Sequence, residues 1–166
     1  MTDTTLWYAF VLGPLAVTVR YWEEHDVEDE GEVEAGARVE LRRVDETVGR
    51  AHRPGAEGFT VQPVSHGGLW RADLFTRIQP PDDEPRFHHH PSFRDDDVGT
   101  RDFDPEIAED PVGWTLTQLR DLPRLLDRAG AGDLADQVDR RHLEQVLPAV
   151  RAAIDTCLAS RPTQPG

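Results

Sequence analysis

The sequence predicts one α+β domain over residues 1–160, with an antiparallel sheet of about five or six strands (residues 6–93) and then a C-terminal helical layer (residues 104–160). Two observations support this fold class. The first two thirds of the chain alternate apolar and polar residues with the period of a strand, and the last third spaces its apolar residues like a helix. Strands that precede helices as a block also argue against βαβ crossovers. We expect residues 161–166 to form a disordered tail.

The expected strands are marked by alternation and by the turns between them. Residues 6–12 are aromatic and aliphatic and end at Gly13-Pro14, and every second residue of 15–22 is apolar, which predicts an inward face. Residues 23–36 are expected to form a solvated acidic loop. The remaining strands are expected at 38–44, 59–64 and 69–78, with a glycine turn at 65–68 and a histidine-bearing strand before residue 91.

The expected helices begin at aspartates. Asp110 with Pro111 is typical of an N-cap followed by proline at the first helical position, and Asp121 begins a second helix. Asp133 is expected to cap a longer helix that Pro148 kinks or splits. Its apolar stripe comprises Leu134, Val138, Leu143, Leu147, Val150, Ile154 and Cys157.

Composition limits the classes of partner. All 18 basic residues are arginine, and the chain has no lysine or asparagine, which indicates a high-GC, bacterial genome. Because such a genome raises the arginine count by itself, a single arginine is weak evidence for anion binding. The net charge is −14, and residues 23–34 contain eight acids without an arginine, so the remainder sums to −14 + 8 = −6. Such an acidic surface disfavours nucleic acid and anionic membranes.

The same composition predicts a cytoplasmic location. Cys157 is the only cysteine, so no disulfide within the chain is possible and a reducing compartment is expected. The most apolar run, residues 6–19, is interrupted by Gly13-Pro14 and is shorter than the roughly 20 residues of a membrane helix. It also lacks the basic residues that precede the apolar part of a signal peptide.

Residues 69–93, LWRADLFTRIQPPDDEPRFHHHPSF, contain the best candidate for a functional site. They are interpreted as two strands joined by a Pro/Asp turn. Because side chains alternate along a strand, one face would then hold five groups able to bind an anion, bind a metal or move a proton. These groups are Arg71, Asp73, Arg86, His88 and His90.

One interpretation of this face is a divalent metal site. His88 and His90 are two residues apart, so their imidazoles share a face and converge on one point. Zinc or a similar ion needs at least one further ligand, for which Asp73 is the first candidate and His66 the second.

The other interpretation is an anion site. Two arginines beside two histidines and Asp73 would suit an anionic ligand or acid–base work on a phosphodiester. In that chemistry His88 or His90 moves the proton, while Arg71 and Arg86 hold the developing charge. A purely structural alternative is an ion-pair ladder Arg71–Asp73–Arg86, in which each pair contributes about 0.2–1 kcal/mol.

The pattern W-R-A-D-L-F, a short polar turn and then R-F-H-H-H-P resembles the core of small bacterial toxins of the TumE type. Those toxins place an arginine–aspartate strand before a histidine-bearing strand that ends in a short H-x-H. The resemblance covers residues 69–93 and implies a metal-independent ribonuclease or phosphodiesterase that uses Arg71, Asp73, His88 and His90. The rest of the chain is similar to an uncharacterised bacterial family.

A third hypothesis is a non-enzymatic partner protein. An acidic segment such as 23–34 can bind a basic protein, as immunity proteins and antitoxins do, although a solvated loop explains it as well. The residues expected to carry such binding are Glu28, Asp29, Glu30 and Glu32. A calcium loop at residues 95–99 is excluded, because the required order of acids, glycine and a distant glutamate is missing.

Overall fold

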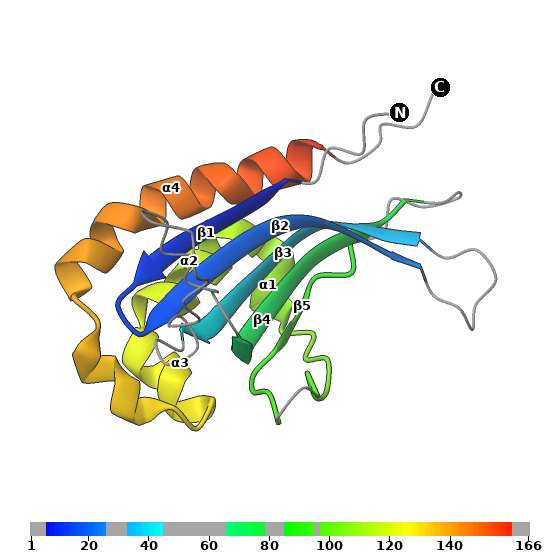
Figure 1. Ribbon diagram of the computed structural model, residues 1–166. Helices are drawn as coiled ribbons and strands as arrows, with labels where there is room; N and C mark the ends of the chain where they lie inside the picture. The colour runs from blue at the N-terminus through cyan, green and yellow to red at the C-terminus, as the bar shows by residue number, and fades with distance from the viewer. Residues whose placement is uncertain (1–5, 26–32, 45–65, 79–84, 95–96, 161–166) are drawn as a thin grey trace, which may run out of the picture.

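The computed structural model describes residues 6–25, 33–44, 66–78, 85–94 and 97–160. Five strands form one antiparallel sheet in the order β1-β2-β3-β4-β5, and helices follow (Figure 1), so the predicted α+β class is confirmed. The strands are β1 (Trp7–Leu12), β2 (Leu15–His25), β3 (Val33–Val44), β4 (His66–Arg77) and β5 (His88–His90).

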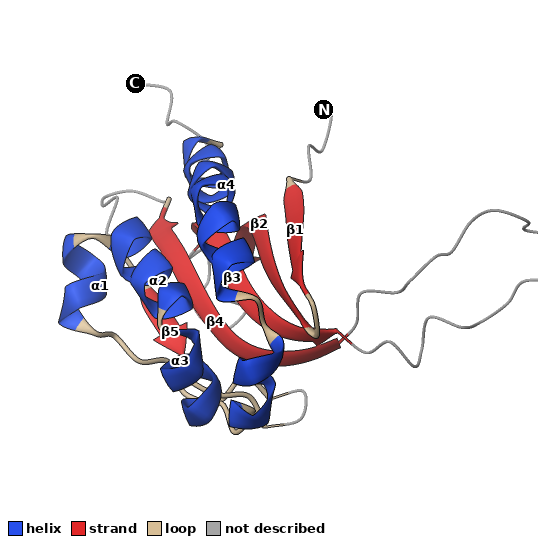
Figure 2. Ribbon diagram, turned by 90° about the vertical axis from the view of Figure 1, so that its left-hand side faces the viewer, coloured by secondary structure: helices blue, strands red, loops and turns tan. Residues whose placement is uncertain are grey.

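The helices of the described residues lie on one face of the sheet (Figure 2). They bury the inward residues that alternation predicts on β2, together with the matching face of β3 and β4. The helices are α1 (Pro105–Glu109), α2 (Pro111–Arg120), α3 (Leu122–Arg128), a 3-10 helix (Gly132–Gln137) and α4 (Arg140–Ala159). None of the helices in the described ranges is long and apolar enough to cross a membrane.

Two predicted loops are shorter than expected because the strands extend into them. β2 continues to His25 and β3 starts at Val33, so only part of the acidic segment 23–36 connects them. The predicted turn at 65–68 is also wrong for Gly67 and Gly68, which belong to β4. A Cβ on Gly68 would lie 2.3 Å from the ring of Phe93, so this glycine permits close packing of a ring.

The helix starts follow the aspartates with one exception. Asp110 caps α2 by accepting a hydrogen bond from the Gly113 amide at 2.9 Å. The long helix is capped by Asp139, not Asp133, because residues 132–137 form a 3-10 turn before it. Pro148 lies inside α4 and does not split it. The predicted apolar stripe is buried throughout.

Candidate metal centre

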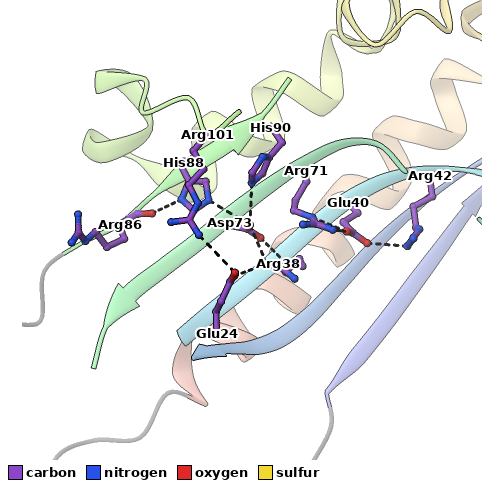
Figure 3. A network of polar contacts seen from close by, with 10 residues as sticks. All are labelled: Glu24, Arg38, Glu40, Arg42, Arg71, Asp73, Arg86, His88, His90 and Arg101. Atoms are coloured by element: carbon purple, nitrogen blue, oxygen red, sulfur yellow. Dashed lines mark hydrogen bonds and ion pairs between the residues drawn. The ribbon is translucent and has the colours of Figure 1, made fainter. Parts of the chain in front are cut away.

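The candidate site lies on the face of the sheet opposite the helices (Figure 3). β4 and β5 pair antiparallel, as the sequence predicts, and the register sets Asp73 opposite His88 and Arg71 opposite His90. Alternation along the two strands brings Asp73, His88 and His90 to the same side. All three are buried, with exposed fractions of 1%, 1% and 4%.

The three side chains are close enough to share one ion. The Nε2 atom of His88 lies 3.5 Å from Oδ2 of Asp73, and Nε2 of His90 lies 3.6 Å from the same oxygen. One ligand atom from each residue falls within 4.8 Å of the other two. The sequence therefore located a compact Asp–His–His group correctly.

One hydrogen bond shows which ring nitrogen of His88 bears a proton. Its Nδ1 donates to the carbonyl oxygen of Arg86 at 2.8 Å. A carbonyl oxygen only accepts, so Nδ1 bears the proton and Nε2 of the neutral ring has a free lone pair. That lone pair faces a carboxylate oxygen of Asp73, and it is buried without a hydrogen-bond partner. Two acceptors facing each other require a cation between them, either a proton on Nε2 or a metal ion.

Asp73 is also held by an arginine that the sequence analysis did not single out. Arg38 on β3 donates from Nε to Oδ1 at 2.7 Å and from Nη2 to Oδ2 at 3.2 Å. Burial raises the pKa of Asp73, but the interactions with His88, His90 and Arg38 outweigh it, so the pKa lies well below its usual value. Asp73 is therefore a carboxylate at neutral pH.

The arginines that the sequence analysis did single out have other partners. Arg71 donates from Nε to Oε1 of the buried Glu40 at 2.7 Å. Arg86 lies 3.8 Å from Glu34, and it contributes to the site through its backbone carbonyl. The interpretation as an Arg71–Asp73–Arg86 ladder is therefore wrong, because the arginine that pairs with Asp73 is Arg38 on β3.

A short segment before α1 covers the histidines. The backbones of His89 and Asp102 exchange hydrogen bonds of 2.9 and 2.8 Å, which adds residues 101–103 beside β5. This pairing brings the ring of Phe103 within 5.2 Å of the His88 ring. Arg101 lies 3.7 Å from Glu24, which accepts a hydrogen bond of 3.0 Å from Arg38.

The other two histidines of interest lie elsewhere. His89 lies on the helix side of β5, with Nε2 at 3.3 Å from Asp102 and its ring 4.8 Å from that of Trp114. A shallow hollow there is lined by His89, Asp102, Trp114 and neighbouring residues, and not by the Asp–His–His group. His66 begins β4 seven residues from Asp73, about 23 Å along an extended strand. The structure thus gives no support to His66 as a ligand.

The acidic residues proposed for partner binding lie outside the described residues. These are Glu28, Asp29, Glu30 and Glu32. The two ends of their segment do belong to the sheet, since Glu24 lies on β2 and Glu34 on β3.

The fold and the site together define an α+β protein with a buried Asp–His–His group and its ion pairs on the sheet face opposite the helices. By comparison with family models, the chain belongs to the family described as Domain of unknown function (DUF7700), whose model matches residues 29–154. A search of the curated proteins found no match, and neither did a search of the solved structures. The family match spans the whole candidate site. The resemblance of residues 69–93 to TumE-type toxins rests on the motif alone.

Proposed function

We propose that this domain binds one divalent transition-metal ion through Asp73, His88 and His90. The observation that supports this most is the approach of His88 Nε2 to Asp73 Oδ2 at 3.5 Å, in a buried site where Nε2 has no hydrogen-bond partner. A divalent ion between them would satisfy both atoms. The hydrogen bond from His88 Nδ1 to the Arg86 carbonyl is the contact by which proteins commonly orient a metal-binding imidazole.

The distances also suit a tetrahedral ion. Zinc lies about 2.0–2.1 Å from imidazole nitrogen and about 2.0–2.2 Å from carboxylate oxygen, so two ligand atoms of one tetrahedral site are about 3.4 Å apart. The separations from Asp73 Oδ2 to the two Nε2 atoms are 3.5 and 3.6 Å. All three ligand atoms lie within 4.8 Å of one another, so the two histidines would move closer together when the ion binds. Three protein ligands leave a fourth position for water.

An anion or a phosphodiester fits this site less well. Arg71 and Arg86, the expected anion-holding groups, face Glu40 and Glu34. The side chain of Asp73 would repel an anion. His88 and His90 are almost fully buried, so a phosphodiester could reach them only after the covering segment moves. The toxin-like hypothesis therefore requires an opening that the metal hypothesis does not.

Titration of the untagged, chelator-treated protein with Zn²⁺, Co²⁺, Ni²⁺ and Mn²⁺ tests the proposal. We expect binding of one ion per chain by calorimetry, and a visible Co²⁺ absorption spectrum typical of a tetrahedral site. His88→Gln and His90→Gln are each expected to weaken binding at least about tenfold, because each removes one of three ligands.

His142→Gln is the matched control, because this histidine is exposed on α4, remote in sequence from the site. It should bind metal like the original chain. Equal metal binding by the His88→Gln and His142→Gln variants would reject the proposed ligands. Absence of binding by the original chain for all four ions would reject the metal function itself.

A further inference from the structure

Among the described residues, the first strand of the sheet has an edge that no other strand covers. In the described parts of the chain, β1 pairs with β2 and with no other strand. Its sequence, Trp7 to Leu12, contains no charged residue and no proline. Edge strands of monomeric proteins are commonly protected by charges, prolines, bulges or very short length. β1 has six residues and none of these protections, whereas the opposite edge of the sheet is short and bridged by Asp102.

The hydrogen-bond pattern shows which backbone groups point outward. The Tyr21 amide donates to the Leu6 carbonyl at 3.0 Å, so Leu6 and Tyr21 form a hydrogen-bonded pair. Hydrogen-bonded pairs alternate along an antiparallel ladder, so Tyr8, Phe10 and Leu12 also point their backbone groups toward β2. Consequently the N–H and C=O groups of Trp7, Ala9 and Val11 point to the free edge.

These outward groups are symmetric about Ala9. We propose that two copies of this chain associate by antiparallel pairing of their β1 strands, with the two Ala9 residues on the twofold axis. In that register Ala9 pairs with the partner's Ala9, and Trp7 pairs with the partner's Val11. Every pair joins residues with outward-facing groups, so each exchanges two hydrogen bonds. The two sheets then form one continuous sheet, and the contact is the self-complementary kind that a twofold dimer requires.

The side chains of β1 favour the same register. Trp7 and Val11 are exposed by 66% and 51% on the face without helices, and they are the largest exposed apolar side chains of the strand. In the dimer each Trp7 lies directly opposite a Val11, an aromatic and β-branched pair of the kind that stabilises sheets. On the helix side Tyr8, which is only half-buried in one chain, lies opposite the half-buried Phe10. Both faces of the strand therefore gain a partner.

Sedimentation velocity over a wide concentration range tests the dimer. We expect a mass near 18.7 kDa at low micromolar concentration that rises toward twice this value near millimolar concentration. Added salt should favour the dimer, because each copy has a net charge of −14 and screening reduces the repulsion. A mass of one chain at every concentration and salt level would overturn the proposal.

Ala9→Pro is the decisive variant. It removes the outward N–H on the twofold axis and leaves every hydrogen bond to β2 in place, and proline is tolerated at such an edge position. We expect dimerisation to weaken at least about tenfold, since the substitution acts twice in a dimer. Ala9→Ser retains the N–H and is the matched control, so it should dimerise like the original chain. A dimer that Ala9→Pro leaves unchanged would show that β1 is not the interface.

Hydrogen exchange of the original chain gives an answer even if Ala9→Pro fails to fold. The amides of Tyr8 and Phe10 are bonded to β2 and should exchange slowly at every concentration. The amides of Trp7, Ala9 and Val11 should exchange fast in the monomer and become protected as concentration rises. Fast exchange of these three amides at the highest concentration would reject the pairing.

Discussion

Replacing Arg38 by methionine should lower the stability of the protein and raise its metal affinity, so this variant separates the two properties of the site. Arg38 makes two hydrogen bonds to a carboxylate with an exposed fraction of 1%, and its own side chain is 6% exposed. Its removal leaves Asp73 buried without its arginine, and breaking such a pair costs about 3–5 kcal/mol. Methionine also lacks the guanidinium that lies over the rings of Trp22 and Phe75, at 4.5 and 5.3 Å from their centroids, so the whole loss comes from the charged group.

The assay is urea unfolding of the metal-free protein at neutral pH. We expect the free energy of unfolding to fall by about 3–5 kcal/mol in Arg38→Met. Arg42→Met is the matched control, because Arg42 also pairs with a glutamate but is 29% exposed, and it should lose no more than about 1 kcal/mol. A loss below about 1 kcal/mol in Arg38→Met, or equal losses in the two variants, would refute the reasoning.

The pH dependence of the same experiment has a definite sign. The pKa of Asp73 is lowered on folding, so the stability that it contributes is present above its unfolded pKa of about 3.9 and is lost as the pH falls below that value. The difference in stability between the original chain and Arg38→Met should therefore shrink below about pH 4.

The metal affinity of Arg38→Met should rise, although the stability of this variant falls. Arg38 competes with an ion for both oxygens of Asp73 and places a positive charge beside the site. Unit charges a few ångströms apart interact by about 4 kcal/mol even at a high effective protein dielectric, and about 1.4 kcal/mol suffices for a tenfold change. Arg38→Met should thus bind Zn²⁺ at least about tenfold more tightly while being less stable without it. Weaker zinc binding in this variant would contradict Asp73 as a ligand.

Three further outcomes test the packing and the buried groups. Gly36→Ala should lower the free energy of unfolding in urea by more than about 2 kcal/mol, because the new Cβ would clash with the Leu74 carbonyl oxygen. Gly67→Ala is the control, because its new Cβ would meet nothing nearer than 3.8 Å, and it should lose less than half as much stability. Burial lowers the pKa of His89, so the stability that this histidine contributes is present above about pH 6.5 and is lost as the pH falls. In His89→Gln the free energy of unfolding should therefore depend less on pH between about pH 7 and pH 5. An unchanged pH dependence would contradict this. Burial raises the pKa of Cys157 to about 11, so a thiol reagent at mildly alkaline pH should label it only after urea unfolding, and fast labelling of the folded chain would show that the thiol is accessible.

Much of the fold follows from local patterns. Alternation located the strands near 6–12, 15–22 and 69–78, and the aspartate–proline pair located the start of α2. The strand extensions at His25 and Val33 were missed because acidic residues in a strand look like a loop when their partners are unknown. Asp133 was predicted as the cap that Asp139 provides, because both residues precede apolar periodicity and only packing distinguishes the 3-10 turn from the helix.

The candidate site was predictable to the extent that it depends on neighbouring strands. Asp73, His88 and His90 come together because alternation and a short connection determine their pairing. Arg38 and Glu40 were missed as site residues, since their partners Asp73 and Arg71 lie 35 and 31 residues away. The available signal was the face of β3 opposite Val39 and Leu41, whose residues Arg38, Glu40 and Arg42 are all charged.

The order of charges on β3 and β4 also selects the alignment of the two strands. In the native pairing Arg38 lies opposite Asp73 and Glu40 opposite Arg71. A slip of two residues keeps every side chain on its face, yet one direction sets Glu40 against Asp73 and the other sets Arg38 against Arg71. Either misalignment brings like charges together in a place with little water. The charges of this polar layer therefore favour the native alignment of β3 and β4 over both misalignments while the sheet forms.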